Sequence, residues 1–225
     1  MSIAQNIETI KHAVAKATAQ SGRGESDVRL MAVSKFQSTE KILQAYNAGI
    51  RLFGENRVQE LCEKFEHSRS ADMQLHMIGS LQRNKVKRIL PLVDCIQSVD
   101  RTELLHEIAK HHAEQSVPIK LLLEVHTAED SKSGFLSEAD VESAINYATE
   151  NGLCVCGFMT MAPFTDDTAR IRESFVTLRK LSERMQKQFT ALDLTELSMG
   201  MSNDYAIAIE EGATLVRIGT AIFAS

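Results

Sequence analysis

The sequence is poor in proline and cysteine and has no long apolar run. Its three prolines and eleven glycines are scattered over 225 residues, so no linker divides the chain and we expect one domain over residues 1–225. Four cysteines are too few for the disulfide framework of a small secreted domain. No apolar stretch approaches the roughly 18 residues that cross a bilayer, which argues against a membrane-spanning helix.

Cys154 and Cys156 alternate within one apolar run, GLCVCGFMT, and would share one face of a strand. No further His or Cys completes a tetrahedral metal site at a familiar spacing, so we expect no metal. We therefore interpret both cysteines as small buried apolar residues.

The chain also lacks an excess of positive charge. Its 25 Lys and Arg are outnumbered by 30 Asp and Glu, for a formal net charge of -5, which argues against a nucleic-acid partner. The densest basic stretch, LQRNKVKRIL, is interpreted as the solvated face of one helix, with a local anion site as the alternative.

Residues 1–26 contain apolar side chains at helical spacing with Glu8 among them. This pattern indicates a first structural helix, because a secretory signal would carry an apolar block and a transit peptide would be poor in acidic residues. We expect this helix to pack on the domain and the protein to be cytoplasmic. The spaced apolar residues are Ile3, Ile7, Ile10 and Val14.

Short apolar, β-branched runs alternate with amphipathic stretches along the rest of the chain. Apolar runs separated by helices indicate parallel strands that are covered on both faces. The predicted strands are residues 29–34, 51–55, 74–79, 93–99, 119–125, 153–160, 194–200 and 214–219. Eight such units predict an α/β fold, a single (β/α)8 TIM barrel. A doubly wound sheet is disfavoured because its first turn would be rich in glycine, whereas this chain has SKFQSTE there.

The segments after the seventh and eighth predicted strands carry residues suited to phosphate. In barrels of this type, phosphate is commonly bound by these two loops, at the carboxyl ends of the strands. In SMGMSNDYAIAIEEGA, Ser202 is placed to cap a helix whose first amides are free. In VRIGTAIF, Gly219 allows close backbone approach and Thr220 adds a hydroxyl. A phosphate site is predicted, and the alternative is an ordinary helix cap and turn.

Lys35 directly follows the first predicted strand, so it lies at the same end of the barrel as these loops. Its apolar flank favours a neutral amine, which can form a Schiff base with an aldehyde or ketone. A sugar-phosphate aldolase and a pyridoxal 5'-phosphate (PLP) site both fit. Arg217 favours PLP, because a permanent cation facing the pyridine nitrogen is compatible with holding the cofactor while weakening the ring as an electron sink. The alternatives are a solvated Lys35 and a salt bridge between Arg217 and Glu124.

Seven blocks of the sequence resemble, in order and spacing, the YggS/PROSC family of pyridoxal phosphate homeostasis proteins. The blocks are MAVSKF, FGENRVQE, HMIGSLQRNK, SKSGF, GFMTMAP, LSMGMSNDY and VRIGTAIF. The resemblance runs from about residue 28 to the carboxyl terminus. It implies a barrel like the amino-terminal domain of bacterial alanine racemase, with the extra amino-terminal helix added.

The resemblance also implies roles for individual residues. PLP would be bound as a Schiff base on Lys35, with Arg217 facing the pyridine nitrogen. The residues that it implies around the rest of the cofactor are Asn56, Ser198, Met199, Ser202, Gly219 and Thr220. A second lysine, Lys132, would receive or relay PLP, with an ordinary loop lysine as the alternative.

Three further positions bear on this comparison. His76 lies in a matching block and is the one histidine that we place near the site, although a structural, hydrogen-bonded histidine is the preferred interpretation. Phe36 and Asn203 depart from the family pattern, in which many members have Thr and Asp. Phe36 is expected to alter only the packing at the mouth of the barrel. Asn203 stands where many family members have a carboxylate, although the next residue, Asp204, supplies one.

The family resemblance implies a PLP-binding protein of intracellular PLP homeostasis, which stores or delivers PLP and affects amino acid and keto acid metabolism, and not an enzyme. An alanine racemase needs a lysine and a tyrosine on opposite faces of the cofactor, and the tyrosine comes from a separate β-domain. The chain ends soon after its eighth predicted strand, so we expect no such domain, and its three tyrosines are predicted on helices.

The alternatives are a PLP-dependent amino acid racemase of low activity and a Schiff-base aldolase. A pure protein-interaction module is disfavoured because polar residues converge at one end of the predicted barrel. The expected partners are PLP and, transiently, apo-PLP enzymes. No nucleic acid and no membrane are expected, and the protein is expected to be a monomer.

Overall fold

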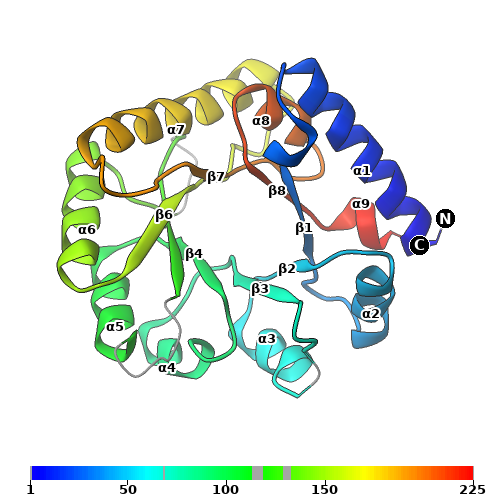
Figure 1. Ribbon diagram of the computed structural model, residues 1–225, viewed down its shortest axis with the longest axis horizontal. Coiled ribbons are helices and arrows are strands. Elements are labelled where there is room, and N and C mark those ends of the chain that lie inside the picture. The colour runs from blue at the N-terminus through cyan, green and yellow to red at the C-terminus, as the bar shows by residue number, and fades with distance from the viewer. Residues whose placement is uncertain (1, 68, 113–118, 129–132, 225) are drawn as a thin grey trace.

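The strands of the computed structural model close into a barrel (Figure 1). The structure describes residues 2–67, 69–112, 119–128 and 133–224. Within these ranges eight parallel strands pair in chain order, and β8 closes the barrel on β1. They are β1 (Arg29–Val33), β2 (Leu52–Glu55), β3 (Gln74–Met77), β4 (Cys95–Val99), β5 (Lys120–Glu124), β6 (Cys154–Met159), β7 (Glu196–Ser198) and β8 (Leu215–Ile218). Each strand lies within its predicted range, which confirms the (β/α)8 barrel.

Helices form the outer layer around the strands, as Figure 1 shows. The α-helices in the described ranges are α1 (Ile3–Gln20), α2 (Thr39–Asn47), α3 (Val58–Phe65), α4 (Val86–Ile89), α5 (Thr102–His112), α6 (Glu138–Glu150), α7 (Thr168–Gln188), α8 (Tyr205–Glu210) and α9 (Thr220–Phe223). Their apolar faces and the outward-facing strand residues form the main hydrophobic core, in which Phe53, Phe158 and Phe175 are fully buried. Burying each such side chain contributes roughly 1.5–3 kcal/mol.

Side-chain caps set the start of several helices. Ser38 accepts a hydrogen bond from the Lys41 amide at the start of α2, and Asp167 accepts two amide hydrogen bonds at the start of α7. The basic stretch predicted as one helix is divided between a 3-10 helix, Arg83–Lys85, and α4. The division follows from the Lys85 backbone, whose φ of -102° is outside the regular helical range.

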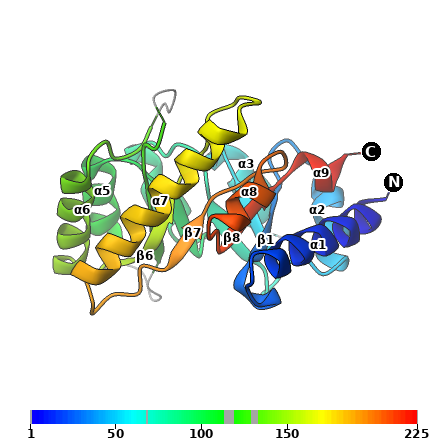
Figure 2. The same cartoon turned by 90° about the horizontal axis from the view of Figure 1, so that it is seen from above.

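The helix α1 lies on the outside of the barrel against α8 and α9, beside both ends of the chain (Figures 1 and 2). The side-chain amide of Asn6 ties it down by donating to the carbonyl oxygens of Ile222 (3.0 Å) and Ala224 (2.9 Å). The helix ends at Gln20, short of the predicted limit at residue 26, because Gly22 adopts a φ of 74° and turns the chain. A 3-10 helix, Glu25–Asp27, then leads into β1.

Alternate strand residues fill the barrel interior with small apolar clusters. One cluster consists of Met31, Leu52 and Leu215, and another contains Cys95 with Leu122 and Met159. This interior packing is typical of TIM barrels.

The predicted burial of both Cys154 and Cys156 is wrong for Cys154, which is exposed because β6 begins there, at the amino-terminal end of the barrel. Cys156 is half-buried. Among the described residues, no helix is both long and apolar enough to pass through a membrane.

Candidate functional site

Residues from β1, β2 and β8 meet at the rim formed by the carboxyl ends of the strands. Lys35 lies just past β1 with its side chain exposed, and Asn56 directly follows β2 and is half-buried. The strand β1 pairs with both β2 and β8. Gly219 follows β8, and a Cβ there would lie 3.3 Å from the carbonyl oxygen of Val33. The chain therefore brings Lys35, Asn56 and Gly219 to one part of the rim.

The loops after β7 and β8 present backbone amides at this rim. No described residue accepts a hydrogen bond from the amides of Ser202, Asn203 or Thr220. Gly200 allows the first loop to fold back on α8, since its φ is 93° and an added Cβ would lie 2.6 Å from the Cβ of Ala208. Amides of this kind bind phosphate oxygens and other anions.

The helix after β7 begins later than the sequence predicts. Asp204 is the N-cap of α8, and its Oδ1 accepts a hydrogen bond from the Met201 amide at 2.5 Å. The prediction that Ser202 caps this helix is wrong, because the Asp204 carboxylate closes the preceding turn. Ser202 lies within that turn, half-buried.

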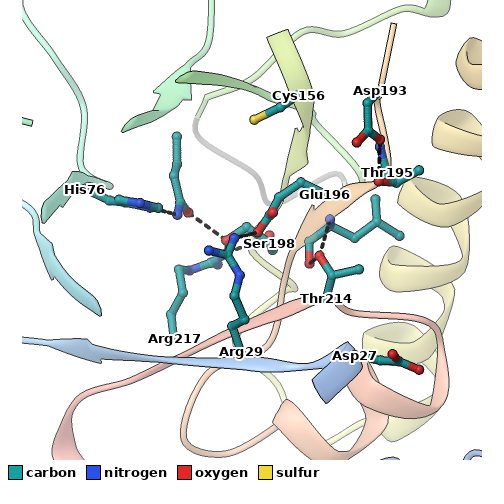
Figure 3. A network of polar contacts seen from close by, with 12 residues as sticks. Asp27, Arg29, His76, Cys156, Asp193, Thr195, Glu196, Ser198, Thr214 and Arg217 are labelled. Atoms are coloured by element: carbon teal, nitrogen blue, oxygen red, sulfur yellow. Dashed lines mark hydrogen bonds and ion pairs between the residues drawn. The ribbon is translucent and has the colours of Figure 1, made fainter. Parts of the chain in front are cut away.

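Arg217 is a buried cation inside the barrel, only 4% exposed. Its guanidinium donates to the Ser198 hydroxyl at 2.8 Å and the Ser198 carbonyl oxygen at 2.7 Å (Figure 3). It also donates to the Thr160 carbonyl oxygen at 2.8 Å. Burial lowers the pKa of Arg217 to about 10, against the opposing effects of Asp204 and Glu124, so it stays charged at neutral pH. Arg217 is thus held by neutral oxygens, and no described carboxylate pairs with it directly.

The hydrogen-bonded chain continues from Arg217 across the barrel. The Ser198 hydroxyl donates to Gln97 Oε1 at 2.6 Å, and Gln97 Nε2 lies 2.8 Å from Nδ1 of His76. Because Arg217 can only donate, the Ser198 hydroxyl donates onward to Gln97 and the Gln97 amide donates to His76. His76 therefore accepts at Nδ1 and carries its proton on Nε2. Burial, the largest cause, lowers the pKa of His76 to about 3, which agrees with a neutral ring.

His76 is therefore a hydrogen-bonded structural histidine, as preferred from the sequence. Its expected place near Lys35 is wrong, because its ring lines a cavity at the amino-terminal ends of the strands. The cause is its position within β3, where it pairs with Cys95 at the start of β4.

Acid is expected to destabilise the fold through His76. The pKa of His76 is about 3 in the fold and near 6.5 when unperturbed, so the unfolded chain binds the proton first as the pH falls. The free energy of unfolding should fall by up to about 1.4 kcal/mol per pH unit below pH 6.5, or about 2 kcal/mol by pH 5. Urea unfolding at pH 7 and pH 5 measures this difference. In a His76→Gln variant, the free energy of unfolding should fall much less between pH 7 and pH 5. An equal fall in both proteins would show that His76 is not the cause.

A partly buried ion-pair cluster holds the turn that carries Lys35. Lys64 of α3 donates to the Ser34 carbonyl oxygen at 2.9 Å and to Glu60 at 2.8 Å. Glu60 in turn accepts a hydrogen bond from the Phe36 amide at 2.8 Å. Side chains of α3 therefore hold the backbone groups on both sides of Lys35 in place.

Glu55 completes the cluster from the end of β2. Its carboxylate is fully buried and accepts hydrogen bonds from Lys64 Nζ at 2.9 Å and the Ser34 hydroxyl at 2.8 Å. Burial raises the pKa of Glu55, and its Oε2 has no partner among the described residues. The cluster thus joins β1, β2 and α3.

Phe36 adopts a strained backbone conformation, with a φ of 62° that residues other than glycine rarely adopt. Its ring is 67% exposed, and the Arg57 guanidinium lies 5.0 Å from the ring centre. Strain of this kind costs about 1–3 kcal/mol and persists only where surrounding contacts impose it. The hydrogen bond from the Phe36 amide to Glu60 is such a contact, and because the backbone makes it, it does not depend on the side chain at this position.

A Glu60→Ala variant is expected to release this turn. The Phe36 amide would lose its acceptor, and its hydrogen exchange should become at least about tenfold faster. Glu60→Gln keeps an acceptor oxygen and should largely retain protection. Exchange measured by NMR at the Phe36 amide tests this, and equal protection in all three proteins would show that Glu60 does not hold the turn.

Two other predicted site residues, Met199 and Lys132, are not seen at the rim. Met199 is fully buried in the main hydrophobic core and does not share the polar network of Ser198. Ser198 itself contacts Arg217 and Gln97. Lys132 lies outside the described residues.

A parallel barrel with a lysine after its first strand, a buried arginine on its eighth and free amides after its last two strands defines a class of protein. A family model described as "Alanine racemase, N-terminal domain" matches residues 3–225. The chain belongs to this family and, within it, to the pyridoxal phosphate homeostasis proteins. It is 36% identical to the pyridoxal phosphate homeostasis protein of Aquifex aeolicus over 224 residues, which covers 99% of this chain and 98% of the relative. The Vibrio alginolyticus protein of the same name is 38% identical over 228 residues, with 99% and 97% covered.

Solved structures agree with this assignment. PipY of Synechococcus elongatus PCC7942 with PLP bound is 34% identical and superposes with a TM-score of 0.86, covering 99% of this chain and 100% of PipY. Alanine racemase from E. faecalis is only 16% identical, with a TM-score of 0.68 over 94% of this chain and 57% of the racemase. The second likeness shows the shared barrel fold alone.

Proposed function

We propose that this chain binds PLP and serves intracellular PLP homeostasis by storing the cofactor and delivering it. The observation that carries the proposal is the rim itself, where the accessible amine of Lys35 lies at the end of a strand that pairs with the strand of Arg217. The name of the relatives and the PLP-bound structure of PipY support it.

The residues at the rim fit the chemical parts of PLP. Lys35 would hold the aldehyde carbon as a Schiff base. The amides and hydroxyls of Ser202 and Thr220, with the backbone of Gly219, would bind the phosphate. Asn56 would lie beside the ring. When bound, PLP supplies a reactive aldehyde and an electron-withdrawing ring.

Arg217 favours a carrier over an enzyme. Its guanidinium is held inside the barrel by Ser198 and Thr160 and stays charged at neutral pH. Facing the pyridine nitrogen, it would keep that nitrogen unprotonated and limit the withdrawal of electrons into the ring.

The positions of two of the three tyrosines also support a carrier. The three lie on α2 (Tyr46), α6 (Tyr147) and α8 (Tyr205). Tyr46 donates to Asp72 and Tyr147 packs on His106, so neither is offered as a second base. A monomeric, cytoplasmic carrier that meets apo-PLP enzymes transiently is the form that we propose.

The proposal is tested by the visible spectrum of the purified protein during titration with PLP. A yellow band that borohydride fixes on the peptide containing Lys35 is the expected result. No band after addition of PLP, or a fixed group on another lysine, would overturn it. Incubation with amino acids in deuterated water separates carrier from racemase, because a racemase would incorporate deuterium at the α-carbon and a carrier would not.

A further inference from the structure

A cavity of about 480 Å³ lies at the amino-terminal ends of the strands, away from the rim of Lys35. Its wall includes residues that begin β1, β3, β4, β5 and β7, together with the segment between α4 and β4. The size is that of a small-molecule site. The function proposed above makes no use of it.

The polar wall of this cavity has one more positive charge than negative charge. Arg29 pairs with Glu196 at 2.5 Å, and Arg69 pairs with Asp94 at 2.5 Å. Lys120, the first residue of β5, also lines the cavity and has no carboxylate partner among the described residues. A single anionic group would balance the wall.

His76 adds a directed hydrogen-bond donor. Figure 3 shows the His76 ring at one side of a space that the side chains of Arg29, Glu196 and Cys156 also border. Gln97 occupies its Nδ1, so the proton lies on Nε2, and that nitrogen is not among the buried atoms left without a partner. His76 and Lys120 both line this cavity, from the neighbouring parts of the wall that β3 and β5 form on either side of β4.

The remaining wall is apolar. Its members come from the α4–β4 segment and from β5 and its approach: Leu90, Pro91, Val93, Ile119 and Leu122. A ligand that satisfies the whole cavity therefore carries one negative group and a short aliphatic body.

We propose that this cavity is a second binding site, for a small aliphatic monocarboxylate. The carboxylate accepts hydrogen bonds on the side of Lys120 and His76, and the aliphatic body packs against Ile119 and Leu122. The site does not depend on PLP binding at Lys35, because the apolar cluster of Met31, Leu52 and Leu215 fills part of the barrel interior between the two ends.

The test is NMR titration of the full chain with butyrate and, as the uncharged match, butyramide. Butyrate should bind in the millimolar range, as expected for so small a ligand, and should shift the His76 ring and the methyl groups of Ile119 and Leu122. Lys120→Gln should weaken binding about tenfold or more, while Lys120→Arg should largely restore it. Lys180→Gln, an exposed lysine of α7, should change nothing.

Equal binding of butyrate and butyramide would overturn the proposal, as would no response to millimolar butyrate or an unchanged affinity in Lys120→Gln. The titration is repeated on Lys35→Ala, in which butyrate binding should persist. A failure at this cavity is thereby distinguished from a failure of PLP binding at the rim.

Discussion

Replacing Lys35 with alanine is expected to abolish stable retention of PLP. Without the amine no covalent bond forms, and only the loop amides and Arg217 remain to hold the cofactor. We expect apparent affinity to fall at least about 100-fold, or about 2.7 kcal/mol. The fold should be unaffected, because the Lys35 side chain is exposed and makes no contact that the described residues require. Absorbance after gel filtration measures retained PLP, and urea unfolding checks stability.

Two matched variants sharpen this experiment. Lys35→Arg keeps the positive charge and removes the nucleophilic amine, so it should lose retention as Lys35→Ala does. Lys41→Ala removes a lysine of the adjoining helix α2 and should retain PLP. Retention by Lys35→Arg would show that charge, and not the covalent bond, holds the cofactor. Loss in Lys41→Ala would move the attachment away from Lys35.

Gly79→Ala is expected to cause a large loss of stability. A Cβ at Gly79 would lie 2.1 Å from the carbonyl oxygen of Asn56, so the backbone after β2 or β3 has to shift. We expect the free energy of unfolding to fall by about 3 kcal/mol or more, which corresponds to roughly 6–12 °C in melting temperature. The shift would displace Asn56 at the rim, and PLP retention should weaken with it.

Gly22→Ala is the control for this variant. Gly22 has a φ of 74°, and an added Cβ would meet no atom within 4 Å. Its cost is limited to backbone strain, about 1 kcal/mol. Thermal unfolding of both variants against the parent protein separates steric overlap from strain, and similar losses in the two would show that the contact between Gly79 and Asn56 relaxes easily.

The barrel could be predicted because strands covered on both faces leave continuous apolar runs in the sequence. Local capping was harder to predict. Ser202, Asn203 and Asp204 are consecutive and each is a good N-cap residue, so the sequence alone does not choose among them. The choice is made by the turn in which Asp204 accepts from Met201.

The rim residues Lys35 and Gly219 could be placed from the sequence because the end of a strand determines where the next residues lie. The groups that support them were missed. Glu60 and Lys64 are four residues apart on α3, a spacing that indicates an ion pair but not that the pair reaches the turn of Phe36. Such contacts join segments distant in sequence, so no local pattern predicts them.

Gln97 was also missed, although a polar residue inside an apolar strand is a usable signal. Its partners, His76 and Ser198, lie 21 and 101 residues away in the chain. Only closure of the barrel brings the three strands together, and the sequence does not indicate which polar residues face one another inside it.

The hydrogen bonds from Arg217 through Ser198 and Gln97 to His76 all point the same way. Arg217 can only donate, and the amide of Gln97 does not exchange its donor and acceptor ends without rotating inside a packed barrel. A proton cannot be relayed along such a chain, because each link would have to reverse. This chain of side chains therefore does not carry protons from one end of the barrel to the other. The two ends of the barrel therefore keep separate protonation states, although hydrogen-bonded side chains join them.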